Sequence, residues 1–426
     1  MTLILILLIV ALLLLGMPIF AVILLAAMTG FYFTDIDLTA IGIELYRLVD
    51  MPLLVSLPLF TFAGYILSES NASQRLLSLT RSLFGWAPDG LAIIVIIACA
   101  VFTAFTGASG VTILALGALL YPALLKAGYK DKFSLGLVTT SGSLGLLLPP
   151  SIPLIIYGII MQQMNIGTHY DFEEIFLAGL IPALLMMIMI ALYVFWDNRH
   201  ISIPRHDFSL AELKKALRTS IWDLPLPFIV FAGIFSGKLA VSEVAAITAL
   251  YVLITEVFIY RDIKIKQLPN IAAESMTMIG GILLILAAAM AFTNFLIDAE
   301  IPDSLFEWMK QHVDSKLTFL LLLNIFLLII GAVLDIFSAL VIIVPLILPI
   351  AISYGINPLH LGVIFLANMQ IGYITPPVGM NLFIASFRFK RSILELYHAS
   401  IPFLLVYLLA ILLITYIPAL SLFLVD

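Results

Sequence analysis

Long, uninterrupted apolar runs constrain this chain more than any other feature of its sequence. Runs long enough to cross a bilayer as helices lie near residues 2–28, 51–67, 173–197, 220–236, 241–260, 269–297 and 392–424. The apolar residues are continuous rather than alternating with polar ones, which favours membrane helices over the strands of a barrel. We therefore expect an all-α polytopic membrane protein.

Composition excludes several classes of function. Hydrophobic residues make up 63% of the chain and charged residues 11%, whereas soluble domains average about half and about a quarter. The net charge of −6 offers no basic surface for nucleic acid, and the single Cys99 gives no zinc or redox spacing. No H-E-x-x-H, G-x-S-x-G or Walker motif is present. We expect neither an enzyme nor a bound cofactor.

Basic residues fall in alternate loops, and such loops are retained in the cytoplasm. Sixteen of the 20 Lys and Arg residues lie in segments 75–81, 126–132, 199–218, 261–266 and 388–391, which we assign to the cytoplasmic side. The segment 198–219 is interpreted as a cytoplasmic linker with an amphipathic arm. The first run has no basic n-region or A-x-A site and is longer than a signal-peptide h-region, so we interpret it as a membrane helix. This places the N-terminus in the cytoplasm and the C-terminus outside.

One part of the chain repeats at a constant spacing of 227 residues. The matching positions are Pro122 with Pro349, Gly128 with Gly355, Gly145 with Gly372, and Pro149-Pro150 with Pro376-Pro377. Each copy contains a pair of shorter helices joined at a small-residue tip, followed by an apolar stretch that Pro-Pro interrupts. An odd number of predicted crossings separates the copies, so we expect inverted repeats with two broken helices.

The two Pro-Pro breaks point to a transport site. Proline lacks an N–H and stops the helix, which leaves upstream carbonyls free. Free carbonyls can coordinate a cation such as Na⁺, and the N-termini of half-helices favour an anion. Inverted repeats with discontinuous helices are typical of secondary transporters, whose sites lie near the bilayer midplane. The alternative is that Pro-Pro only kinks two ordinary helices.

The tips of the helix pairs are further candidates. The first tip, 106–110, has no charged or aromatic anchor, which favours a re-entrant hairpin over a full crossing; its small residues could instead serve helix packing. The second tip, 331–338, contains Asp335, which either caps the following helix or takes part in an ion site. Polar side chains near the second break either line a substrate cavity or join helices by hydrogen bonds: Asn368, Gln370, Thr375 and Asn381.

Two runs carry a family resemblance. The run 142–158, GSLGLLLPPSIPLIIYG, and the run 372–383, GYITPPVGMNLF, resemble signatures of the large membrane subunit of tripartite ATP-independent periplasmic (TRAP) transporters. Segments 121–129, 233–246 and 334–349 resemble the same subunit, so the likeness extends over essentially the whole chain. The first tip departs from the family, because it has fewer hydroxyls than the Ser-rich tips of that subunit.

The resemblance implies a sodium-driven importer of a small organic acid anion (a carboxylate, sugar acid or sulfonate), working by an elevator movement in a bacterial inner membrane. It implies two partners, a small four-helix membrane subunit on a separate polypeptide and a periplasmic substrate-binding protein. The moving domain would comprise 88–165 and 316–388, the scaffold 1–87 and 166–315, and 389–426 a C-terminal helix. The alternative is a stand-alone Na⁺-coupled carboxylate symporter that uses no binding protein.

The resemblance also places two sodium sites, each between one tip and the break of the same copy. The residues expected to bind sodium are Thr106, Gly107, Ser109, Gly110, Gly145, Pro149, Gly331, Asp335, Ser338, Gly372, Thr375 and Gly379. The residues expected to bind the substrate anion are Ser109, Pro150, Ser151, Asp335, Pro377 and Asn381.

Overall fold

The computed structural model describes residues 11–12, 15–34, 37–39, 41–43, 46, 51–164, 170–199, 208–313 and 315–425. Every regular element in these ranges is helical. Seven of the described helices are long and apolar enough to cross a membrane, or up to nine if each strongly bent helix pair is one span. The expected all-α polytopic membrane protein is confirmed. Parts of the predicted first span and of the 198–219 linker lie outside the described residues.

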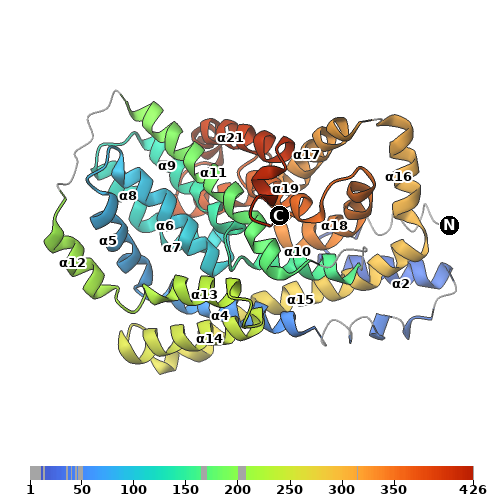
Figure 1. Ribbon diagram of the computed structural model, residues 1–426, viewed down its shortest axis with the longest axis horizontal. Helices are drawn as coiled ribbons and strands as arrows, with labels where there is room; N and C mark the ends of the chain where they lie inside the picture. The colour runs from blue at the N-terminus through green and yellow to red at the C-terminus, as the bar shows by residue number, and fades with distance from the viewer. Residues whose placement is uncertain are drawn as a thin grey trace.

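Five helices form a layer along one long edge of the molecule, and we call it the lateral layer (Figure 1). Its members are α2 (Ile19–Phe33), α4 (Ser56–Glu69), α13 (Pro225–Phe235), α14 (Val241–Leu253) and α15 (Leu268–Asp298). Helix α15 packs against α2 and α4, and α14 packs against α4 and α13. The π-helix η3 (Ile254–Ile259) extends α14, and the short 3₁₀ segments η1 (Pro52–Val55) and η4 (Ile265–Gln267) precede α4 and α15.

The first repeated region begins with a helical hairpin. Its elements are α6 (Gly90–Thr106), α7 (Ser109–Ala115), α8 (Gly117–Lys126), α9 (Asp131–Ser141), the 3₁₀ segment η2 (Leu144–Leu147), α10 (Ile152–Gln163) and α11 (Phe172–Asn198). The second arm of this hairpin bends by 52° between α7 and α8. The first break, 142–151, separates α9 from α10, includes η2 and contains the cis peptide bond between Pro149 and Pro150.

The second repeated region has the same order of elements. They are α17 (Lys316–Val333), α18 (Ile336–Ser353), α19 (Pro358–Gly372), α20 (Met380–Phe389), α21 (Ile393–Tyr416) and the short α22 (Ala419–Leu422). The second break, 373–379, separates α19 from α20 and contains the cis bond between Pro376 and Pro377. An amphipathic helix precedes each hairpin: α5 (Ala72–Phe84) the first and α16 (Ile301–His312) the second.

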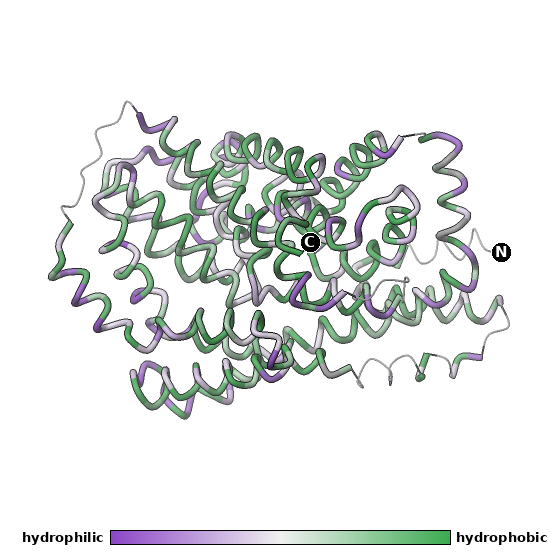
Figure 2. The backbone as a smooth tube through the Cα atoms, viewed as in Figure 1, coloured by the Kyte–Doolittle hydropathy of each residue, from purple (hydrophilic) through white to green (hydrophobic). Residues whose placement is uncertain are grey.

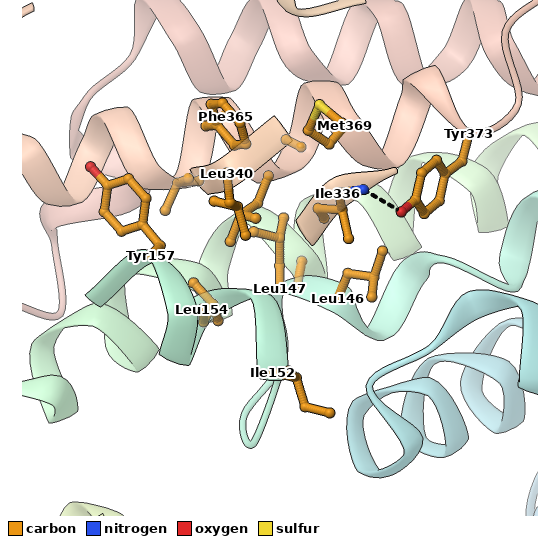
Figure 3. Close-up of a cluster of buried hydrophobic side chains, with 14 of the residues drawn as sticks. Leu146, Leu147, Ile152, Leu154, Tyr157, Ile336, Leu340, Phe365, Met369 and Tyr373 are labelled. Carbon is orange, nitrogen blue, oxygen red and sulfur yellow. Dashed lines mark hydrogen bonds between the residues drawn. The ribbon is translucent and has the colours of Figure 1, made fainter. Parts of the chain in front are cut away.

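The two regions pack into one core beside the lateral layer. Helix α10 contacts α18, and α11 and η2 both contact α19. Figure 3 shows side chains of the first region, such as Leu147 and Leu154, facing Leu340 and Phe365 of the second. This shared apolar core fixes the two breaks relative to each other, because close-packed interiors resist displacement.

Polar and basic helices lie at the ends of the molecule. In Figures 1 and 2 the hydrophilic α12 (Leu210–Thr219) lies at the left end with α5 and α8, and α16 lies at the right end. The helices between them are largely hydrophobic, and α11 exposes a row of large apolar side chains, Leu184, Ile188 and Leu192. Such a row suits contact with lipid.

Candidate functional site

The first tip is built from small residues that allow a tight reversal. Helix α6 ends at Thr106, Gly107 turns the chain with a φ of 65°, and α7 begins at Ser109. A Cβ atom on Gly107 would lie 2.4 Å from Cδ1 of Ile152, the first residue of α10. The tip is therefore held directly against the far side of the first break.

The first break is pressed onto the backbone of α6. A Cβ atom on Gly145 would lie 2.1 Å from the carbonyl oxygen of Ala100, so only glycine fits there. The Thr103 hydroxyl donates to the carbonyl of Gly142 at 2.7 Å and accepts from Thr112 at 2.7 Å. Sequence reasoning missed both threonines, although hydroxyls inside an apolar helix were a usable signal.

The second tip uses an acidic cap instead of a glycine turn. Oδ1 of Asp335 accepts hydrogen bonds from the backbone N–H groups of Phe337 and Ser338, each at 3.0 Å, and the Ser338 hydroxyl donates to Oδ2. The N–H of Ile336 donates to the Tyr373 hydroxyl at 2.7 Å (Figure 3). Asp335 therefore caps α18, one of the two roles expected for it.

The second tip and the second break also lie in close contact. A Cβ atom on Gly372 would lie 2.4 Å from the carbonyl carbon of Gly331. Beyond the prolines, Gly379 has a φ of 56° and donates its N–H to the carbonyl of Ala332 at 3.1 Å. The Thr375 hydroxyl, which lies within the break, donates to the carbonyl of Ile371 in the last turn of α19. The glycines predicted for this site thus set the distance between hairpin and break.

A buried hydrogen bond joins the tip of the first region to the helix that follows the second break. The Ser109 hydroxyl at the first tip donates to Oδ1 of Asn381 at 2.7 Å, just after the second break, and both residues are buried. Nδ2 of Asn381 has no partner within the described part of the chain. Gly110 packs beside Ile384, so α7 and α20 run side by side from this contact. A buried amide with free donors is a candidate ligand for an anion or a water.

The remaining predicted substrate residues lie apart from this pair. The Ser151 hydroxyl donates to the carbonyl of Leu146 within the first break, beside Pro150. The carbonyl of Pro377 accepts from the Tyr397 hydroxyl of α21. Among the described residues no hydrogen bond links Ser151, Asp335 or Pro377 to Ser109 and Asn381, so the six predicted residues form several groups.

Asn368 joins helices through its Nδ2, one of the two roles expected for it, while its Oδ1 has no partner within the described chain. Its Nδ2 donates to Oδ1 of Asn324 on α17 at 2.6 Å, and Asn324 also bonds the Thr415 hydroxyl on α21. This buried network ties three helices together and explains one polar position near the second break. Gln370, in contrast, is buried and its amide has no hydrogen-bond partner within the described chain.

A charged cluster joins the helix before the first hairpin to the lateral layer. Arg75 on α5 lies 2.6 Å from Asp223 and 2.6 Å from Glu256, and it also pairs with Asp262. Burial opposes ionisation of Asp262, but hydrogen bonds from Asn71 and Arg75 outweigh it and keep the pKa of Asp262 below its usual range. The sequence assigned Arg75 to the cytoplasmic side of the membrane but did not predict its ion-pair partners, because they are 148 or more residues away.

The oxygen atoms at the tips and breaks are those of carbonyls, hydroxyls and one carboxylate. Within the described residues no group of three or more His, Cys, Asp and Glu side chains could hold a metal ion. A transition-metal centre has no ligand set in this part of the chain, whereas a weakly bound alkali cation takes oxygen ligands of the kind that the breaks present.

Comparison with known proteins places the chain. The family model described as "Tripartite ATP-independent periplasmic transporter, DctM component" matches residues 6–420. A C4-dicarboxylate TRAP transporter large permease protein DctM of Rhodobacter capsulatus is 33% identical over 97% of this chain and 96% of its own length. An isethionate TRAP transporter permease protein DctMQ of Oleidesulfovibrio alaskensis is 32% identical over 88% of this chain and 58% of that protein.

A solved structure shares the fold. The YdaH transporter of Alcanivorax borkumensis, whose topology is described as unusual, matches 89% of this chain and 87% of its own with a TM-score of 0.65 and 16% identity. That likeness concerns the fold alone. The family match and the curated relatives settle the class that the two Pro-Pro runs indicated: this chain belongs to the DctM family of tripartite ATP-independent periplasmic transporters and is a transporter permease, not an enzyme.

Proposed function

We propose that the chain is a sodium-coupled importer of a small organic acid anion that a periplasmic protein delivers, and that it works by an elevator movement. The contact between Ser109 and Asn381 carries this proposal, because it brings the tip of one hairpin to the broken helix of the other region. Convergence of two repeats at discontinuous helices is the arrangement in which secondary transporters bind substrate and ions.

Two sodium sites are proposed between each tip and its own break. The first would use oxygens of Thr106, Gly107, Ser109, Gly110, Gly145 and Pro149, and the second those of Gly331, Asp335, Ser338, Gly372, Thr375 and Gly379. The support is proximity: Gly107 adjoins α10, and Gly331 adjoins Gly372. In the second site Asp335 would add negative charge while it continues to cap α18.

The substrate anion is proposed to bind where Ser109 meets Asn381. The free Nδ2 of Asn381 and the N-terminus of α20 both favour an acceptor with negative charge. The proposed substrate-binding residues also include four that would line a cavity between the two breaks: Pro150, Ser151, Asp335 and Pro377. The relatives are named for a C4-dicarboxylate and for isethionate, which supports a carboxylate or a sulfonate as the anionic group.

The proposed moving unit consists of 88–165 and 316–388, sliding on a scaffold of 1–87 and 166–315. Helix α11, which this division places in the scaffold, packs on η2 and on α19, and α21 packs on α9. These contacts favour assigning both helices to the moving unit instead. A Cβ atom on Gly64 of α4 would lie 2.7 Å from the carbonyl of Phe105, so the lateral layer meets the first tip closely. Phe105 also packs against apolar side chains of α4, so the first tip lies at the boundary between the two proposed units.

The proposed setting is a bacterial inner membrane, with the N-terminus cytoplasmic and the C-terminus periplasmic. The grouping of α5, α8 and α12 at one end supports this orientation, because these helices carry Arg75, Arg81, Lys126, Lys214, Lys215 and Arg218 (Figure 1). The proposed partners are the small four-helix membrane subunit, the periplasmic binding protein and membrane lipid.

Uptake into proteoliposomes tests the proposal. Vesicles would hold this chain and its small subunit, with the binding protein and a labelled C4-dicarboxylate or isethionate outside. We expect accumulation with a Na⁺ gradient and none with K⁺ at matched potential. If several Na⁺ ions enter per anion, an inside-negative potential adds about 2.3 kcal/mol per net charge per 100 mV. Equal uptake in K⁺ would reject sodium coupling, and concentrative uptake without binding protein would favour the stand-alone symporter.

A further inference from the structure

A basic groove lies at the end of α20, away from the substrate site proposed above. Its volume is about 490 Å³, and it is lined by Leu114, Ser386, Phe387, Arg388, Lys390 and Arg391. We call it the basic groove. Leu114 comes from α7 and the other residues from the C-terminal end of α20 and the turn after it. Lys390 ends the helix with a φ of 53°, a conformation that L-residues rarely adopt, and this turn brings Arg391 into the lining.

The positive charge of the groove is only partly compensated. Arg391 lies 2.9 Å from Asp131 and 3.9 Å from Glu395. Within the described chain Arg388 and Lys390 have neither an ion pair nor a side-chain hydrogen bond, and both are exposed. Three cations facing two carboxylates leave the groove net positive, and a concave surface with low-dielectric walls concentrates that potential.

The groove and the Ser109–Asn381 contact lie at opposite ends of the same helix pair. Helices α7 and α20 pack together, with Ser109 bonded to Asn381, Gly110 against Ile384, and Leu114 beside the basic residues. At 1.5 Å per residue, the seven residues from Asn381 to Arg388 span about 10 Å. The basic groove therefore lies about two turns of α20 away from the contact.

We propose that the basic groove binds the carboxylate or sulfonate group of the transported anion on the cytoplasmic side, as a release site. This inference rests on the proposed function. The guanidinium of Arg388 offers a planar pair of donors for such a group, and the Lys390 ammonium adds a mobile charge. The anionic substrate is favoured as occupant because the groove is net positive, lies on the helix pair that forms the substrate contact, and has four polar or charged residues among its six lining residues.

The test compares binding from the two sides in proteoliposomes with the small subunit. The double variant Arg388→Gln/Lys390→Gln should raise the half-saturating internal concentration of labelled C4-dicarboxylate in efflux and exchange by about ten-fold, the low end for focused potentials. The external half-saturation and the Na⁺ dependence should stay unchanged. The control, Lys264→Gln/Lys266→Gln, removes the same charge beside η4 of the lateral layer and should leave both sides unaffected.

Three results overturn the proposal. One is an unchanged internal half-saturation in the double variant, and another is an equal rise in the control. The third is a rise seen in vesicles with phosphatidylglycerol but absent in pure phosphatidylcholine, which would identify an anionic lipid headgroup as the occupant. Sodium coupling is tested separately, by replacing Na⁺ with K⁺ for the unmodified protein. If uptake does not depend on Na⁺ but the double variant still raises the internal half-saturation, the proposed coupling is rejected and the groove proposal stands.

Discussion

The two breaks have matching sequences but different surroundings. At the first break, Pro149, Pro150 and Ser151 are all buried, whereas at the second Pro376, Pro377 and Val378 are exposed. The difference arises from the neighbours: the first break is enclosed by α6, α11 and α19, while the outer side of the second is open. Two copies of one motif thus differ in accessibility, because packing encloses one break and leaves the other open.

The two tips differ in chemistry and agree in geometry. The first reverses at Gly107 and contains no ionisable group, while the second is organised by Asp335. Both nevertheless lie against the break of the same region. The comparison teaches that close backbone approach is the shared requirement, and that only the second tip adds a full charge. The predictions below test this difference.

The largest expected effect comes from filling the space at the buried first break. Gly145→Ala places a Cβ atom against the backbone of Ala100 and Ala104, which cannot yield as a side chain would. We expect a loss of about 3 kcal/mol of stability, the upper range for overpacking, measured as thermal unfolding in detergent. Gly280→Ala on α15 is the control: its Cβ would meet nothing within 4 Å. Equal stability of the two variants would show that the first break is not closely packed.

Next in size is the contrast between Pro150→Ala and Pro377→Ala. Each change restores an N–H, which is buried at the first break and exposed at the second. An unpaired buried N–H costs about 1–3 kcal/mol, while an exposed one bonds water. Pro377→Ala should therefore reduce uptake about ten-fold through loss of the break, with little change in stability, and Pro150→Ala should lower both. Normal uptake with normal Na⁺ dependence in both variants would mean that the breaks are only kinks.

A third prediction separates the two roles of Asp335. Asn keeps an acceptor for the N–H groups of Phe337 and Ser338, so Asp335→Asn should preserve the cap, whereas Asp335→Ala should cost about 1 kcal/mol. If Asp335 also faces Na⁺, the Asn variant should raise the half-saturating Na⁺ concentration about ten-fold. Titration of uptake with Na⁺ gives the answer, and an unchanged midpoint in Asp335→Asn would assign Asp335 to the cap alone.

The sequence predicted the parts of the fold that local chemistry controls. Apolar runs placed most of the spans, although α13 within the predicted span 220–236 has only 11 residues. Pro and Gly at a fixed spacing placed both breaks, because these residues act on their own backbone. Contacts between distant residues could not be found this way: the bond from Ser109 to Asn381 joins positions 272 residues apart. The Arg75 cluster and the link from Asn324 to Asn368 were missed for the same reason, since many polar residues could pair and only packing selects among them.

The smallest expected effect concerns the bond that joins the first tip to the second break. Removing either partner leaves the other buried and unpaired, which costs about 1 kcal/mol of interaction free energy. Ser109→Ala and Asn381→Ala should therefore each lower uptake by about 3- to 10-fold. The double variant should lose less than the sum, with a coupling energy of about 1 kcal/mol between the two positions. Ser353→Ala is the control, because its hydroxyl bonds only its own helix at Ile350. If the effects of the two single variants were strictly additive, the coupling energy would be zero, and the contact between Ser109 and Asn381 would not contribute to uptake.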